Sequence, residues 1–384
     1  MVDVGPGRPV WALGLMSGTS MDGVDTALVL SDGETIAGFG PVFSLSPAYD
    51  AAGQARIAAA GRHCATRIAA GQAPDPAALA DASRVVEARH GEAVAALRAC
   101  GGGGRARVIG FHGQTVFHAP ERGLTVQLGD GARLAAAVSA PVAWDFRSAD
   151  MAAGGEGAPL APFFHHACAR WAGLGKPVAF LNIGGVANVT WIDPAIADPV
   201  AACLAFDTGP GNALIDDWMR RRTGRAPDRD GAAAAAGRVH RDRLAPTATR
   251  AWLDRPPPKS LDRNDFAALL AAMDGLSTED GAATLTELTV DCIVDAGRHM
   301  PSRPSRWLVC GGGRRNATLM ARLAEGLAAK VEPVESIGLD GDFLEAQAFA
   351  WLAVRALRGL PTSAPRTTGC AHPVCGGRIS HPAG

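Results

Sequence analysis

The sequence lacks a run of about 18 apolar residues, an excess of basic residues and a signal-peptide pattern at its start. Without the apolar run, we expect no helix that spans a membrane. The formal net charge of −1 gives no electrostatic reason to bind nucleic acid. A missing charged and apolar leader argues against secretion. We therefore expect a cytoplasmic protein with neither a membrane nor a nucleic-acid partner.

The chain also lacks the paired CxxC spacing of a zinc site. Its eight cysteines are scattered, and several lie in apolar segments, which favours buried free thiols over disulfides. His112 and His118 are six residues apart, or roughly 20 Å along a strand, which is too far to share an ion. The metal ligands therefore stay unknown, and we interpret the histidines as groups that position a substrate or support a turn.

At 384 residues the chain is long for one hydrophobic core, which favours two domains. Hydrophobic residues make up 47% of it, as in an ordinary globular protein. Short apolar runs suited to strands alternate with alanine-rich segments suited to helices, notably residues 51–70 and 76–100. Residues 224–264, rich in Arg, Ala and Pro, are the least informative part of the sequence.

Two short apolar runs, at residues 10–16 and 24–30, flank a small polar loop and predict a β-hairpin. The loop contains Gly18 and Gly23 and two hydroxyl side chains. Glycines allow close backbone approach, so amides and hydroxyls can face one anion, as in phosphate-binding loops. An ordinary Gly/Ser turn is the alternative, because short glycine motifs are frequent false positives.

A second segment repeats this pattern. Residues 179–193 run from an apolar strand through a polar loop with Gly184 and Gly185 to another apolar strand. Two such hairpins, far apart in one chain, suggest two similar lobes that each present a loop to a shared cleft. A nucleoside triphosphate is the expected occupant of that cleft.

An aspartate follows a buried apolar run at residues 203–206 and enters a tight Gly-Pro-Gly turn before a helix. This turn would project Asp207 from a strand end, where α/β folds keep their chemistry, and Asp207 is our first choice for a catalytic base. A helix N-cap is the alternative, but the glycines on both sides of Pro210 exceed what a cap needs. Between a later strand and helix, Gly311, Gly312 and Gly313 would let a flat ring or a phosphate lie against the backbone.

Two further places carry polar groups of interest. Asp145 and Arg147 follow a short strand and precede a glycine-rich run, which suits a small polar ligand. An ion pair between them that merely holds the loop is the alternative. Glu345 is a polar exception at the start of an apolar helix, residues 343–358, and is a candidate ligand contact. A first-turn carboxylate favoured by the helix dipole would explain it equally well.

Seven motifs occur in order along the chain: GLMSGTSMDGVD (14–25), FHGQTVFHAP (111–120), DFRSADMAAGGEGAPLAP (145–162), LNIGGVANVT (181–190), FDTGPGN (206–212), CGGGRRN (310–316) and EAQAFAWLA (345–353). Together they closely resemble the anhydro-N-acetylmuramic acid kinases. The resemblance implies the α/β fold of sugar kinases, actin and heat-shock chaperone ATPases, with two ribonuclease-H-like lobes and an interlobe cleft. One lobe would comprise residues 1–140, completed by 355–384, and the other residues 141–354.

The resemblance also implies a cytoplasmic homodimer that acts in cell-wall recycling and uses ATP and Mg²⁺ on an amino sugar. Asp207 matches the family's catalytic aspartate, and Glu345 matches its substrate-contacting glutamate. The expected nucleotide contacts are Gly18, Thr19, Ser20, Met21, Asp22, Gly23, Val24, Asp25, Gly184, Gly185, Asn188, Gly311, Gly312 and Gly313. The remaining expected substrate contacts are His112, Gln114, Asp145, Arg147 and Gly157.

The family's reaction opens a 1,6-anhydro ring with water while the released 6-oxygen is phosphorylated, giving N-acetylmuramic acid 6-phosphate. Water attacking the anomeric carbon needs a carboxylate base on the face opposite the leaving oxygen. The leaving oxygen needs no separate acid, because the γ-phosphorus accepts it. The protein must mainly align three atoms and shield charge.

Two positions depart from the expected pattern. Met16 stands where many kinases of the wider superfamily carry an aspartate, so Asp22 or water would contact magnesium instead. Glu156 stands where family members often have glutamine, and its charge would need a cationic neighbour such as Arg147. An actin- or chaperone-like ATPase is the rival hypothesis. It would share both hairpins but would not need the HGQT and GGEGAPL segments.

Overall fold

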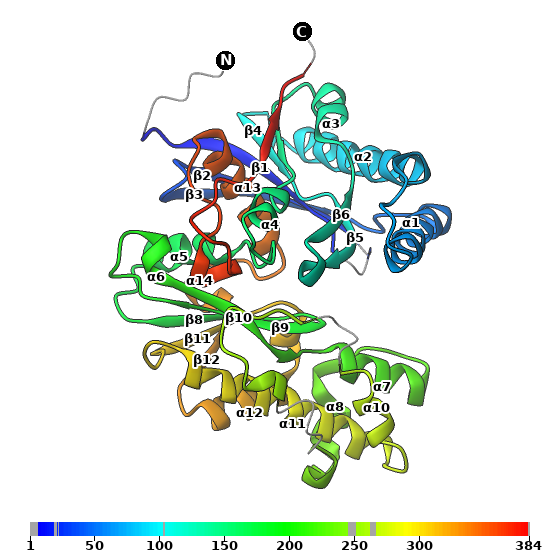
Figure 1. Ribbon diagram of the computed structural model, residues 1–384. Helices are drawn as coiled ribbons and strands as arrows, with labels where there is room; N and C mark the ends of the chain where they lie inside the picture. The colour runs from blue at the N-terminus through cyan, green and yellow to red at the C-terminus, as the bar shows by residue number, and fades with distance from the viewer. Residues whose placement is uncertain are drawn as a thin grey trace. The chain divides into compact units, whose positions relative to one another are not determined.

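The structure is a computed structural model that describes residues 7–18, 21, 23–102, 104–244, 251–261 and 266–382. It divides into two compact units, drawn in Figure 1. Unit 1 comprises Met1–Trp171 and Phe343–Gly384, and unit 2 comprises Ala172–Asp342. Each unit is built on its own β-sheet, with helices packed against it.

The sheet of unit 1 has the strand order β13-β7-β4-β1-β2-β3. Strands β1 (Val10–Met16), β2 (Val24–Ser31) and β3 (Ile36–Leu45) form an antiparallel meander. Strands β4 (Val108–Phe111) and β7 (Val142–Trp144) continue the sheet parallel to β1, and β13 (Arg378–Ser380) closes it antiparallel to β7. The first predicted hairpin is therefore β1 and β2.

The sheet of unit 2 repeats this plan. Its order is β10-β9-β8-β11-β12. Strands β8 (Val178–Ile183), β9 (Val186–Ile192) and β10 (Cys203–Pro210) are an antiparallel meander, and β11 (Arg306–Cys310) and β12 (Lys330–Pro333) run parallel to β8. The second predicted hairpin is β8 and β9. The same order and directions in both units confirm the expected α/β fold with two ribonuclease-H-like lobes.

Helices cover both faces of the unit 1 sheet. On β1, Leu13 and Leu15 pack into an apolar cluster with α1 (Ala51–Ala69) and α2 (Pro76–Ala99). Gly14 faces the other way, because side chains alternate along a strand, and α13 (Leu344–Leu357) lies against it. The remaining elements of unit 1 are β5 (Gln114–Ala119), β6 (Leu124–Leu128), η1 (Pro120–Arg122), α3 (Gly131–Val138), α4 (Ser148–Ala152), α5 (Pro162–Trp171) and α14 (Pro365–Thr368).

Two helices, α11 (Thr278–Ala296) and α12 (Ala317–Leu327), pack with the unit 2 sheet around an apolar cluster that includes Leu181, Val309 and Leu319. The other elements are α6 (Pro199–Ala202), α7 (Ala213–Thr223), η2 (Arg229–Gly231), α8 (Ala232–Ala236), η3 (Arg241–Leu244), α10 (Leu269–Ala272), η4 (Gly297–His299), η5 (Gly312–Arg315) and η6 (Val334–Ile337). The described part of residues 224–264 contains the short helices η2, α8 and η3, and the sequence indicated none of them.

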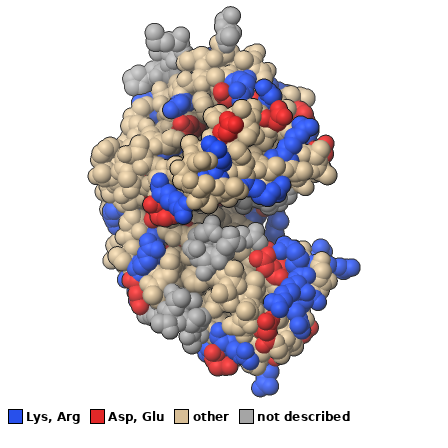
Figure 2. All heavy atoms as spheres, turned by 45° about the vertical axis from the view of Figure 1, so that its right-hand side comes forward, with Lys and Arg blue, Asp and Glu red and all other residues tan. Residues whose placement is uncertain are grey.

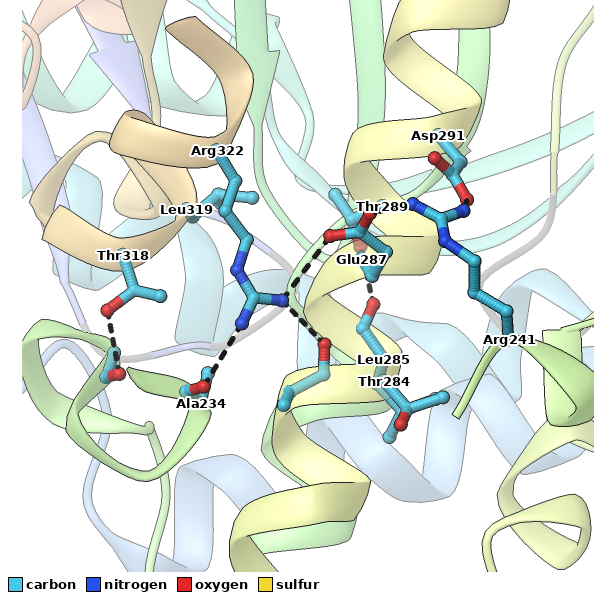
Figure 3. Close-up of polar contacts among 12 residues, drawn as sticks. Ala234, Arg241, Thr284, Leu285, Glu287, Thr289, Asp291, Thr318, Leu319 and Arg322 are labelled. Carbon is cyan, nitrogen blue, oxygen red and sulfur yellow. Dashed lines mark hydrogen bonds and ion pairs between the residues drawn. The ribbon is translucent and has the colours of Figure 1, made fainter. Parts of the chain in front are cut away.

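The alanine run of α8 cannot make side-chain hydrogen bonds, so polar groups of other helices hold it in place (Figure 3). From α12, Arg322 donates to the carbonyl oxygens of Ala234, at 3.2 Å, and Ala283, at 2.8 Å, and pairs with Glu287 at 3.4 Å. Thr318 donates to the carbonyl of Gly231 at 2.8 Å. These bonds tie the segment before η3 to α11 and α12.

The boundaries of the two units differ from those expected from the sequence. Residues 141–171 belong to unit 1, because β7 pairs with β4 and α5 packs on α13. Residues 343–354 also belong to unit 1, because α13 packs on β1, β2 and β4. These segments join unit 1 through contacts with strands far away in the sequence, which local patterns do not show.

Three expectations from composition can be compared with the structure. The eight cysteines, all of which the structure describes, are thiols and form no disulfide. Among the described residues, none of the helices is both long and apolar enough to cross a bilayer. On the face drawn in Figure 2, basic and acidic side chains lie interspersed, as the small net charge suggests.

Candidate functional site

The sequence-predicted site residues that the structure describes lie at one edge of each sheet or on elements beside it. In unit 1, this edge consists of the carboxyl ends of β1, β4 and β7, the residues that follow them, and the start of α13; we call it the unit 1 edge. In unit 2, it consists of the ends of β8, β10 and β11 and the residues that follow; we call it the unit 2 edge. Loops at the carboxyl ends of strands are where α/β folds bind ligands.

The first glycine loop follows β1 at the unit 1 edge. The backbone N–H of Met21 donates to the carbonyl of Gly18 at 3.1 Å, and Met21 has a φ of +57°, so the loop turns tightly here. Gly23 leads into β2, where Val24 is buried and Asp25 is half-buried opposite Met16. The expected contacts Thr19, Ser20 and Asp22 lie outside the described residues.

Gln114 braces this loop from β5. Its side-chain oxygen accepts from the hydroxyl of Ser17 at 2.8 Å, and its amide nitrogen donates to the carbonyl of Gly18 at 3.1 Å. The Tyr49 hydroxyl reaches Ser17 at 3.4 Å. Both the oxygen and the nitrogen of the buried Gln114 amide are hydrogen-bonded, so this residue supports the loop conformation. The expected contact with the sugar did not include this role.

Arg147 links three segments of the unit 1 edge. It donates to the carbonyl of Gly157 at 2.7 Å and contacts Nε2 of His112 at 2.9 Å. A guanidinium only donates, so Nε2 of His112 accepts and the ring is neutral with its proton on Nδ1. Burial and the charge of Arg147 together hold the pKa of His112 well below its usual range, which agrees with this tautomer. Burial lowers the pKa of Arg147 itself to about 10, opposed by Glu345 and Asp150.

The carboxylate of Asp150 is a functional group that the sequence reasoning missed. It is fully buried and accepts from the N–H of Gly157 at 2.7 Å, from Thr368 at 2.6 Å and from Ser363. Gly157 thus donates through its N–H to Asp150 and accepts at its carbonyl from Arg147. Its φ of +70° suits glycine. A cluster of this kind could be suspected from the motif that contains Asp150, but its hydroxyl partners lie near the C-terminus.

Glu345 stands at the start of α13, and glycines bring that helix against the sheet. A Cβ on Gly14 would lie 1.8 Å from the carbonyl oxygen of Ala346, and a Cβ on Gly110 would lie 2.0 Å from that of Phe349. The side chain of Glu345 remains accessible, but the protein packed around it removes hydration and raises the pKa of its carboxyl. Arg147 opposes this rise and Asp25 adds to it.

Asp145 does not pair with Arg147 as the alternative interpretation suggested. Its carboxylate accepts from the hydroxyl and N–H of Ser148 and pairs with Arg378 of β13 at 3.1 Å. With Trp144, His112 and Gln127, Asp145 lines a cavity of about 220 Å³ beside the end of β4. Glu156 is held through its N–H, which donates to the carbonyl of Thr368 at 2.7 Å.

In unit 2, the second glycine loop is bonded to the Gly-Pro-Gly turn. The carbonyl of Gly184 accepts from the N–H of Asn212 at 2.7 Å, and that of Gly185 accepts from Gly211 at 2.9 Å and Ala213 at 3.1 Å. From α11, the buried hydroxyl of Thr289 donates to the Gly211 carbonyl at 3.0 Å. The loop and the turn therefore form one rigid backbone surface.

Asp207 lies within this surface on β10. It is half-buried and paired in register with Asn188 of β9, and a β-bulge follows it before Gly209. Its N–H donates to the carbonyl of Lys259 at 2.9 Å, and one carboxylate oxygen accepts from the N–H of Leu261 at 2.8 Å. Two backbone bonds to one distant segment therefore fix the position of this carboxylate.

The triple glycine divides into two kinds of position. Gly311, with a φ of +72°, and Gly313 pack tightly on β8, since a Cβ there would lie 2.3 Å from Asn182 Oδ1 and 2.5 Å from Ile183 Cβ. At Gly312 the nearest atom to a Cβ would be 3.9 Å away. At Gly184 and Gly185 that distance is 3.6 Å. These last three glycines leave backbone open to a ligand. Arg314, nearly buried, anchors the loop to Glu335 at 2.9 Å and Asp342 at 2.8 Å.

A closed metal cage is not formed by the described residues, among which no group of three or more His, Cys, Asp or Glu side chains converges. Magnesium in phosphoryl-transfer sites usually keeps several waters and binds the phosphates with one or two carboxylates. The carboxylates described at the two edges, such as Asp25 and Asp207, are donors compatible with that kind of site.

Comparisons with known proteins agree with one another. A model of the family described as anhydro-N-acetylmuramic acid kinase matches residues 10–382. The anhydro-N-acetylmuramic acid kinase of Cereibacter sphaeroides is 53% identical over 98% of this chain and 97% of its own. Anhydro-N-acetylmuramic acid kinase 1 of Jannaschia sp. is 52% identical, with 97% and 96% covered. The corresponding kinase of Rhodospirillum rubrum is 51% identical, with 96% and 93% covered.

Proposed function

The chain belongs to the anhydro-N-acetylmuramic acid kinase family, and from that membership we propose the reaction that it catalyses. It uses ATP and water to convert 1,6-anhydro-N-acetylmuramic acid into N-acetylmuramic acid 6-phosphate during cell-wall recycling. The observation that carries the proposal is Asp207, a carboxylate fixed within β10 near its carboxyl end, at the same edge as three glycines with open backbone. We further propose that the enzyme works in the cytoplasm as a homodimer.

Asp207 acts as the general base. It takes a proton from a water molecule as the water oxygen bonds to the anomeric carbon of the sugar. The bond from that carbon to the 6-oxygen breaks, and the 6-oxygen bonds to the γ-phosphorus while ADP leaves. Attack on the face opposite the leaving oxygen makes the reaction an inverting one. The protein supplies alignment and charge shielding, which are its main tasks in phosphoryl transfer.

The unit 2 edge suits the nucleotide, because Gly184, Gly185 and Gly312 leave backbone uncovered. Flat rings and phosphates can lie against such backbone, whereas any side chain would keep them away. In unit 1, the loop between β1 and β2 is the further contact that we propose for the phosphates. Mg²⁺, for which Asp22 or water is the expected contact, would neutralise the charge of the phosphates.

The unit 1 edge suits the sugar. Glu345 and Arg147 offer a carboxylate and a guanidinium close enough to shift each other's pKa. A muramic sugar carries a lactyl carboxylate, which a guanidinium binds well. His112 and Gly157 hold Arg147 in place, and Asp145 lines the neighbouring cavity. We propose that Gln114 contributes by supporting the loop conformation. The residues that contact the sugar or position those contacts are Glu345, Arg147, His112, Gly157 and Asp145.

The test is to incubate the protein with ATP, Mg²⁺ and 1,6-anhydro-N-acetylmuramic acid and to follow ADP and the sugar product by mass spectrometry. We expect one ADP for each N-acetylmuramic acid 6-phosphate, and negligible ADP without the sugar. ADP release that is indifferent to the sugar would contradict the proposal and favour an ATPase of the actin or chaperone kind.

A further inference from the structure

A strap of chain at residues 251–261 lies against the unit 2 edge and contains Lys259, whose role the reaction leaves unexplained. Lys259 is one of only three lysines in the chain and is 3% exposed. Its Nζ donates to the carbonyl of Leu253 at 2.7 Å and lies 4.5 Å from the centre of the Trp252 ring. A single ammonium thus closes the strap on itself.

Residues of unit 2 outside the strap also bind it. The carbonyl of Leu253 accepts from Arg298 at 2.7 Å and lies 3.3 Å from Nε2 of His299. Arg298 in turn pairs with Asp254 of the strap at 2.9 Å. The carbonyl of Leu253 is therefore contacted both by the strap's own Lys259 and by two side chains that follow α11.

The same strap supplies both backbone bonds to Asp207. The carbonyl of Lys259 accepts the Asp207 N–H at 2.9 Å, and the N–H of Leu261 donates to the Asp207 carboxylate at 2.8 Å. Lys259 also lies 6.0 Å from the ring centre of Phe206, the neighbour of Asp207. Moving the strap would therefore move the carboxylate.

The buried charge is not explained by stability. Burial lowers the pKa of Lys259 to about 8, with Arg298 and Arg255 acting in the same direction and Asp295 opposing them. The unfolded chain then binds the proton more tightly than the folded protein, so the charged amine costs folding free energy below about pH 8. A buried charge that costs stability and stands next to a candidate base points to a functional role.

We propose that Lys259 is a positioning residue that holds the strap so that the backbone of residues 259–261 orients Asp207. This inference rests on the proposed function, in which Asp207 is the base. A displacement of about 1 Å in a catalytic group can cost roughly 100-fold in rate, so loss of the lysine should act on turnover rather than on ligand affinity.

The experiment compares Lys259→Met and Lys259→Arg with a control, Lys330→Met, which removes an exposed lysine paired with Glu332 at 2.7 Å. For Lys259→Met we expect kcat to fall roughly 10- to 100-fold, KM for ATP and sugar to stay within about twofold, and the melting temperature not to fall. Lys259→Arg keeps the charge and should recover most of the lost kcat. Lys330→Met should match the native protein.

Amide hydrogen exchange provides a readout that does not need turnover. In Lys259→Met we expect the amides of Asp207 and Leu261 to exchange at least about tenfold faster than in the native protein, and in Lys259→Arg and Lys330→Met at the native rate. Unchanged exchange in Lys259→Met, or a kcat within twofold of native, would overturn the role of Lys259. If the native protein shows no sugar-dependent turnover, the proposed function fails, while the exchange result still decides whether the lysine holds the strap.

Discussion

The two units share a strand order, but the corresponding edges of their sheets present different chemical groups. At the unit 1 edge, charged side chains meet: Arg147, Glu345 and the buried Asp150 lie around one glycine loop. At the unit 2 edge, the surface is mostly backbone, and Asp207 is the single carboxylate that our prediction placed there. Under the proposed function, the side chains at the unit 1 edge would bind the sugar, and the backbone at the unit 2 edge would bind the nucleotide.

The largest expected effect comes from removing the unit 2 carboxylate. Asp207→Asn keeps the size of the side chain but removes the base, so we expect turnover to fall about 100- to 10,000-fold. The nucleotide affinity, measured by calorimetry, should stay within about twofold because the glycine backbone is untouched. Asp217→Asn, which removes the partner of an ion pair with Arg220 on α7, is the control. Native turnover in Asp207→Asn would remove this residue from the mechanism.

Next in size is the loss of the unit 1 guanidinium. Arg147→Met should weaken sugar binding about 10- to 100-fold, since hydrogen bonds to charged groups contribute about 1.5–3 kcal/mol. Nucleotide affinity should not change. Calorimetric titrations with each ligand separate the two, with Arg84→Met, at an exposed pair with Asp81, as the control. A variant that lost nucleotide and sugar affinity equally would break the proposed division between the edges.

The packing of α13 offers a third test. Gly14→Ala would place a methyl group 1.8 Å from the Ala346 carbonyl, so α13 and its Glu345 must move. We expect the free energy of unfolding to fall by about 1–3 kcal/mol and sugar affinity to fall with it. Gly38→Ala, in β3 of the same sheet with no atom within 4 Å, should change neither. Equal melting temperatures for the two variants would show that the close helix contact is dispensable.

The smallest effect concerns the ionisation of Glu345. Loss of hydration raises its pKa in the folded protein, so the ionised form costs stability as the pH rises above about 4.5, its ordinary value. Glu345→Gln removes this cost. At pH 7 the variant should melt at the same or a slightly higher temperature than the native protein, and the difference should disappear toward pH 4.5. A clearly lower melting temperature at pH 7 would mean that the electrostatic attraction between Glu345 and Arg147 outweighs the loss of hydration.

The sequence predicted the parts of the site that local patterns encode. Alternation and glycine spacing identified both hairpins. The expected strand end at Asp207 was wrong, because β10 continues to Pro210 and Asp207 lies within the strand. The sequence could not show which distant segments would support these groups. Asp150 and Ser363 are 213 positions apart, and Asp207 and Leu261 are 54 apart. Such contacts arise from the packing of the whole unit, so neither Asp150 nor the strap of Lys259 stood out.

The predicted boundaries of the units differ from those of the structure for the same reason. The helix of residues 344–357 follows unit 2 in the chain but packs on unit 1, because Gly14 and Gly110 make room for its backbone. Each of these glycines lies in an apolar strand, where it looks like a weakness in the strand pattern. Only the structure shows that both glycines face the same helix.

The most direct test of the central claim, that water activated by Asp207 attacks the anomeric carbon, is to run the reaction in water enriched in oxygen-18. The sugar phosphate should be analysed before its anomeric hydroxyl exchanges with solvent. We expect one heavy oxygen on the anomeric carbon and none in the phosphate ester. Label in the phosphate, with the anomeric carbon unlabelled, would mean that water attacks phosphorus, and it would contradict the role given to Asp207.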